Sequence, residues 1–154
     1  MHEFQNQDSR QTLAQGLNEY FLGNPGLIHG RNMSPAAEHF FRCHDAVHVV
    51  FGCGTSLDDE AAVKIASIFG TTAGLSVLKS YRLHESLSIY KQLRVADVLL
   101  SIAHSVVVVP RTITRCLAQR RRWPWSEYQP HLHVALQEIR GQFGIKVAHI
   151  HRMR

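Results

Sequence analysis

Cysteine is scarce in this sequence, and the cysteines that occur are not paired. Only three of the 154 residues are cysteine, namely Cys43, Cys53 and Cys116, and no CxxC spacing is present. An odd number without such a pair argues against a disulfide framework and against a zinc knuckle built on thiolates. We therefore expect three reduced thiols.

Long apolar runs are also missing. The longest, VLLSIAHSVVVV at 98–109, falls short of the roughly 20 residues that a membrane-spanning helix needs, and it contains His104 and two serines. The opening stretch, MHEFQNQDSRQTLAQ, is polar and carries both signs of charge, unlike a signal or transit peptide. These absences predict a cytoplasmic protein that contacts the inner membrane face only peripherally, if at all.

The chain has no repeat of fixed period and no low-complexity stretch, and its length suits a single domain over residues 1–154. Apolar residues recur at helical spacing in the stretches 9–22, 34–51 and 56–69, from 74 through the arginine-rich stretch, and in 131–143. The valine run at 106–109 could form a short strand, but it lies inside a longer helical frame, which favours a helix. We predict an all-α, single-domain bundle of about six helices.

Two consecutive helices have clear local boundaries. Ser34 is a natural N-cap with Pro35 at the first helical position, so a helix should run from there to about Phe51. Glycines interrupt the pattern in GCG (52–54), and Ser56 is among the N-cap candidates that follow. This break lets the second helix turn back on the first.

Two histidines share the apolar face of the first of these helices. His44 and His48 are spaced i and i+4, in one stripe with apolar residues such as Phe40 and Val47, so both should point inward. Imidazoles at this spacing come close enough to chelate one divalent ion. Without an ion, each would need its own hydrogen-bond partner in the core, and simple packing is the alternative interpretation.

Two carboxylates accompany the histidines. Glu60 lies in the first turn of the next helix and can face the imidazoles once that helix turns back. Asp45 is one residue, or roughly 100 degrees, from His44, so it is either a ligand or an acceptor that orients an imidazole. We take His44, Asp45, His48 and Glu60 as the candidate metal ligands.

The donor set narrows the choice of metal without deciding it. Two histidines with one or two carboxylates and no thiolate suit zinc, and equally suit iron or manganese with open positions for a substrate or oxygen. We expect a divalent metal ion as the cofactor, with zinc as the first candidate and iron or manganese as alternatives. Cys43 and Cys53 flank the motif, and we leave both out of the ligand set.

Positive charge exceeds negative charge along the chain. Seventeen Lys and Arg against twelve Asp and Glu give a formal net charge of +5, which favours anionic partners. Five arginines and no acid lie between residues 111 and 122, and Trp123 and Trp125 follow them. We expect these arginines to contact an anionic headgroup or a membrane surface, with the tryptophans at the boundary between water and lipid. They are Arg111, Arg115, Arg120, Arg121 and Arg122. A solvated basic helix end is the alternative.

The sequence resembles a known family at these motifs. HDxxH, then eleven residues, then Glu is the signature of the coenzyme Q biosynthesis protein four family, and this chain has it with the full spacing as His44, Asp45, His48 and Glu60. The stretch RRRWPWSEYQPHLHVALQEIRGQFGI also resembles the end of that family, which has an arginine-rich segment, a tryptophan-containing loop and a helix. Together the similarity covers roughly residues 34–146.

This resemblance implies an all-helical fold, a bound divalent metal, a cleft for a long prenyl or acyl chain and a role in ubiquinone (coenzyme Q) biosynthesis. Family members have been regarded both as organisers of the biosynthetic enzyme complex and as metal-dependent enzymes that oxidatively decarboxylate the quinone ring. We therefore expect a prenylated quinone precursor or another lipid as the small-molecule partner. Other ubiquinone-biosynthesis proteins and further copies of this chain, in a homo-oligomer, are the expected protein partners.

Other functions stay open at this point. A non-catalytic, lipid-binding scaffold would use the metal to clamp two helices together. A metal-dependent hydrolase is a further alternative, because HDAVH superficially resembles the HExxH helix of zinc peptidases, although aspartate is one methylene shorter than glutamate. Nucleic acid is not an expected partner, because no helix-turn-helix, RNP or zinc-finger pattern accompanies the arginines.

Overall fold

A computed structural model describes residues 2–25, 34–79 and 95–147. They form the α-helices α1 (Leu13–Gly23), α2 (Pro35–Phe51), α3 (Leu57–Phe69), α5 (Val95–Leu117) and α6 (Leu136–Phe143). Short 3-10 helices lie at Glu3–Gln5, Gly74–Ser76 and Gln129–His131. Within the described ranges there is no strand, and β-type pairing is limited to two isolated bridges. The predicted all-α bundle is confirmed.

The helix that carries the histidines begins and ends where the sequence predicts. The Ser34 hydroxyl accepts a hydrogen bond of 3.2 Å from the backbone N–H of the third helical residue. At the other end, Gly52 adopts a left-handed φ of 70°, a conformation that favours glycine and ends α2. Ser56 then caps α3 in the same way as Ser34 caps α2. Local sequence therefore accounts for the reversal between α2 and α3.

Two other helices begin later than predicted. α1 begins at Leu13 and not at Ser9, because Thr12 caps the helix with its side chain. α6 begins at Leu136 and not at residue 131, because Gln129–His131 forms a separate 3-10 turn. Both predicted helices exist, but each loses its first residues to a capping or turn structure.

The valine run at 106–109 lies in α5, so its helical interpretation is confirmed, and Pro110 lies inside the same helix. Of the helix predicted from residue 74 onward, the structure describes the 3-10 helix Gly74–Ser76 and the few residues after it, while 80–94 lie outside the described residues. Among the described residues, no helix is both long and apolar enough to cross a bilayer.

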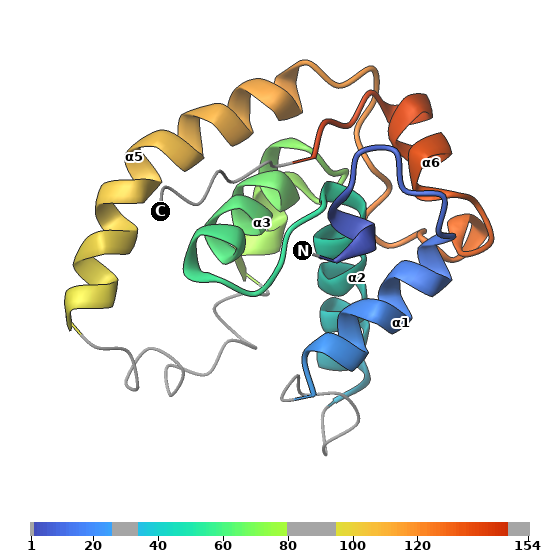
Figure 1. Ribbon diagram of the computed structural model, residues 1–154, viewed down its shortest axis with the longest axis horizontal. Coiled ribbons are helices and arrows are strands. Elements are labelled where there is room, and N and C mark those ends of the chain that lie inside the picture. The colour runs from blue at the N-terminus through green and yellow to red at the C-terminus, as the bar shows by residue number, and fades with distance from the viewer. Residues whose placement is uncertain (1, 26–33, 80–94, 148–154) are drawn as a thin grey trace.

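α2 lies at the centre of this arrangement. Figure 1 shows α1 and α3 on either side of α2, with the long helix α5 beyond α3. α2 contacts α1, α3 and α6, whereas α3 packs most extensively against α5. As a result, the last two turns of α2 are enclosed, and every residue from Cys43 to Phe51 is buried.

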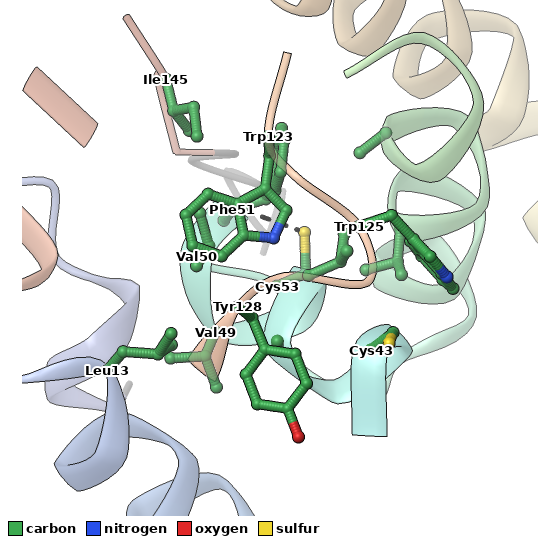
Figure 2. Close-up of a cluster of buried hydrophobic side chains, with 14 of the residues drawn as sticks. Leu13, Cys43, Val49, Val50, Phe51, Cys53, Trp123, Trp125, Tyr128 and Ile145 are labelled. Atoms are coloured by element: carbon green, nitrogen blue, oxygen red, sulfur yellow. Dashed lines mark hydrogen bonds between the residues drawn. The ribbon is translucent and has the colours of Figure 1, made fainter. Parts of the chain in front are cut away.

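Both tryptophans belong to the core around the end of α2. Figure 2 shows Trp123 and Trp125 in the same cluster of buried hydrophobic side chains as Phe51. The backbone N–H of Trp123 donates to the Gly70 carbonyl (2.8 Å), which ties the segment after α5 to the end of α3 and directs both indoles inward. Trp123 is 0% exposed and Trp125 8% exposed, so the prediction that they lie at a lipid boundary is wrong.

A buried arginine joins three segments of the chain. Arg140 of α6 is 1% exposed, and its guanidinium donates hydrogen bonds to the backbone carbonyls of Phe4, Asn6, Val49 and Val50. The last two carbonyls belong to the C-terminal turn of α2, where the helix dipole favours positive charge. Burial lowers the pKa of Arg140 to about 10, so the guanidinium stays charged at neutral pH. Arg140 therefore fixes the N-terminal segment against the end of α2.

Candidate metal site

The candidate site lies where the end of α2 meets the start of α3. His44, His48 and Glu60 each offer one ligand atom, and these atoms all lie within 4.8 Å of one another. The two imidazole centroids are 4.7 Å apart. His44 is 8% exposed and His48 is 0% exposed, so both histidines point inward as predicted. The described part of the chain contains no other group of three such donors.

The imidazole of His48 has a defined tautomer. Its Nδ1 atom lies 2.8 Å from the Gly54 carbonyl, and because a carbonyl can only accept, Nδ1 carries the proton. The other nitrogen, Nε2, lies 3.4 Å from Oε1 of Glu60 and has no hydrogen-bond partner among the described residues. Gly54 belongs to the glycine-containing turn that leads into α3, so the same turn brings Glu60 back and orients His48.

Tyr20 of α1 covers the site from the side opposite to α3. Its ring stacks on the imidazole of His48, with centroids 5.1 Å apart and an interplanar angle of 30°. Tyr20 is 1% exposed, and burial, followed by the negative charges of Asp45 and Glu60, raises the pKa of its hydroxyl. Sequence reasoning missed this residue, because Tyr20 fits the apolar pattern of its own helix and nothing in its spacing connects it with HDAVH.

Both histidines are kept neutral by their surroundings. Burial lowers the pKa of His48 to about 4, against an opposing effect of its hydrogen bond to Gly54. Burial, and after it the neighbouring His48, lowers the pKa of His44 well below its ordinary value. A neutral imidazole is the form that binds metals, so both side chains are in the correct state at neutral pH.

Asp45 lies beside the site, but it is not among the three donors that converge. It is 3% exposed, and burial, followed by the charge of Glu60, raises the pKa of its carboxyl to about 8. In the metal-free protein this carboxyl is thus largely protonated at neutral pH. Its role as a ligand stays a prediction, and its location also suits an acceptor that orients an imidazole.

Glu60 gives the site its connection to solvent. Its side chain is 33% exposed, in contrast to the enclosed His48. It lies in the first turn of α3, which carries three acidic residues at its positive N-terminal end. Of the three donors, Glu60 is thus the one most accessible to solvent.

The cysteines take no part in the donor group. All three are free and buried. Burial raises the pKa of Cys43 to about 12, and it also raises the pKa of Cys53, so both thiols are protonated in the metal-free protein at neutral pH. Their omission from the ligand set stays a prediction.

The predicted headgroup arginines differ in their surroundings. Four of them are exposed, namely Arg111, Arg120, Arg121 and Arg122. Arg121 lies over the ring of Phe143, 4.3 Å from its centroid, and Arg120 donates to the Gly141 carbonyl. Arg115 is half-buried in a cleft next to α3. Contact of these arginines with a headgroup or membrane stays a prediction.

No family model matches the chain, and no curated protein or solved structure matches it either. The resemblance to the coenzyme Q biosynthesis family therefore rests on the residues of the two motifs. The geometry of the site bears on the first motif alone, because it brings His44, His48 and Glu60 together. Membership of the family stays a prediction.

Proposed function

We propose that the protein binds one divalent metal ion through His44, His48 and Glu60 and acts in ubiquinone biosynthesis on a prenylated quinone precursor. The observation that carries the metal is the convergence of three donor atoms within 4.8 Å at a largely buried point between two helices. The substrate and the pathway rest on the resemblance of the HDxxHx11E motif and the arginine and tryptophan segment to the family.

The distance between two acceptors supports an ion at this point. With the proton of His48 on Nδ1, its Nε2 atom and Oε1 of Glu60 are both acceptors, and they face each other at 3.4 Å. Two acceptors at this distance repel each other unless a cation or a proton lies between them. Imidazole and carboxylate donors without thiolate suit zinc first, and iron or manganese also accept them.

Three protein ligands are typical of a metal site that also binds substrate, because they leave a coordination position open. When bound, the metal supplies Lewis-acid or redox chemistry, which is what oxidative decarboxylation of a ring carboxylate needs. The role of the protein's own residues is to hold the metal-binding side chains in place. Gly54 and Tyr20 fix the imidazole of His48, and Glu60 is the most exposed of the three donors.

The origin of the ligands on two helices favours a second candidate function. An ion bound by His44, His48 and Glu60 links α2 to α3 and stabilises their contact. A lipid-binding scaffold of a biosynthetic complex needs no more than this structural effect. Both candidates require the metal, and they differ in turnover.

A turnover assay distinguishes the two candidates. The metal-loaded protein is incubated under oxygen with a prenylated aromatic carboxylic acid, and the decarboxylated product is measured. We expect product from the native chain and loss of product in Glu60→Gln. The control is Glu38→Gln, which removes an exposed glutamate paired with Arg42 on α2. Turnover that is unchanged in Glu60→Gln contradicts the enzyme, and metal-dependent stability without turnover supports the scaffold.

A further inference from the structure

A second polar site lies on the other side of α3, away from the histidines. A small cleft, partly open to solvent, lies where α3, α5 and the segment after α6 meet, and its interior of about 10 Å³ has room for about one water molecule. Its apolar wall comes from Phe51, Ala62 and Ala66. On α3, Ala62 follows Glu60 by two residues, which is about 200 degrees of helix rotation, so the cleft and the metal donors use opposite faces of that helix.

Three long polar side chains converge at this cleft. Arg115 and Gln119 come from successive turns of α5 and the residues that follow it, and Lys146 comes from the segment after α6. Spacing of i and i+4 places the first two on the same side of the chain, and the chain reversal after α6 brings the lysine to them. The sequence alone does not predict that these three residues lie close together, because Lys146 comes 27 residues after Gln119.

The amide of Gln119 is the second observation that indicates a ligand. Both its nitrogen and its oxygen are buried, and neither has a hydrogen-bond partner among the described residues. A buried amide without a partner costs free energy, so such groups normally face a water molecule or a ligand. Here the amide lines a cleft whose interior can hold one water molecule or one oxygen atom of a ligand.

The charges at the cleft are also uncompensated. Neither Arg115 nor Lys146 forms an ion pair with a carboxylate of the described residues. The carboxylate of Asp59, which acts on the cleft residue Cys53 as Arg115 does, accepts a hydrogen bond of 2.7 Å from the Ser56 hydroxyl and forms no ion pair with either cation. Two cations and an amide that can donate are a combination that binds oxyanions.

We propose that this cleft binds the phosphate or carboxylate group of a small molecule, held by Arg115, Gln119 and Lys146. The interior of about 10 Å³ admits no more than one oxygen atom of the anion, so the rest of the molecule lies outside the cleft, next to Arg115 and Lys146. The site is separate from the metal donors and does not depend on the function proposed for them.

Calorimetric titration of the metal-free protein tests this site directly. The probes are inorganic phosphate and butyrate, and a third titration uses vesicles that contain phosphatidylglycerol. We expect saturable binding of at least one free anion, weakened about tenfold or more in Arg115→Gln and in Gln119→Met, because each substitution removes a donor to the anion. Binding to vesicles alone, with the same dependence on both residues, identifies a lipid headgroup as the source of the oxyanion.

The matched control is Arg10→Gln, which removes an equal charge from an exposed position before α1, outside the predicted headgroup arginines. Its affinity for the probes should equal that of the native chain. Gln119→Met should also leave the protein folded and no less stable, since it removes a buried amide without a partner. The proposal is overturned if no probe binds, if Arg10→Gln weakens binding as much as Arg115→Gln, or if Gln119→Met binds as tightly as the native chain.

Discussion

Replacement of Arg140 by methionine removes a group on which the end of α2 depends. The guanidinium donates to four backbone carbonyls, two from the N-terminal segment and two from the last turn of α2. Methionine fills a similar volume but leaves these carbonyls without their donor. Since Val49 and Val50 directly follow His48, the change also loosens the turn that positions the histidines.

The size of the effect follows from these hydrogen bonds. A hydrogen bond to a charged group contributes about 1.5–3 kcal/mol. The cost of burying the guanidinium charge offsets part of the sum, and removal of one partner from a buried charged interaction typically costs about 3–5 kcal/mol. We therefore expect Arg140→Met to lower the free energy of unfolding by about 4 kcal/mol, a large part of the total for a domain of this size.

Urea denaturation of the native chain and of three variants measures this effect. Arg140→Lys should be intermediate, because an ammonium group has three donors and the guanidinium has five. Arg42→Met is the control: its arginine is exposed and pairs with Glu38, so we expect a loss below about 1 kcal/mol. A loss of less than about 1 kcal/mol in Arg140→Met would refute the role of Arg140 in holding the end of α2.

Three further predictions concern the same region. Because burial lowers the pKa of His48 to about 4 from 6.5, the contribution of this group to stability should be fully present above pH 6.5 and fall by about 3 kcal/mol as the pH drops to 4. The difference in the free energy of unfolding between the native chain and His48→Gln, measured by urea denaturation at several pH values, separates this contribution from those of His44 and Asp45, and a difference that does not change with pH contradicts it. Tyr20→Leu should weaken metal affinity more than Tyr20→Phe does, since phenylalanine keeps the ring that stacks on His48. Competition with a chelating dye measures both affinities, and equal values would contradict a role for the ring. Gly52→Ala should destabilise the fold by about 1–2 kcal/mol, because φ is 70° at this position and a Cβ atom would lie 2.8 Å from the Val147 side chain. The control Gly141→Ala adds a Cβ atom that meets no atom within 4 Å, so it should be neutral or stabilising. Thermal melts compare the two variants, and equal melting temperatures contradict this prediction.

The parts of the site that the sequence predicts are those encoded over short distances. His44 and His48 share a helical face by their spacing alone, and the caps at Ser34 and Ser56 with the glycine at residue 52 predict how α3 returns with Glu60. These elements need no information from the rest of the chain, because hydrogen bonds between close neighbours determine them.

The parts that the sequence does not predict depend on contacts between distant segments. An arginine in a short helix such as α6 is typical of a solvated face, and Arg140 is buried because its partners come from residues 4–7 and 49–50. Trp123 likewise follows an arginine run, and only its bond to Gly70 shows that the segment turns inward. In both cases the side chain's environment is supplied by tertiary structure.

The central claim is that His44, His48 and Glu60 bind a metal ion, and elemental analysis of the protein purified without a His-tag or chelator tests it most directly. The native chain is compared with His48→Gln and with the control His39→Gln, which alters an exposed histidine of the same helix. We predict about one equivalent of zinc, iron or manganese in the native chain and in His39→Gln, and its loss in His48→Gln. No bound metal after reconstitution, or an equal content in all three proteins, would contradict the claim.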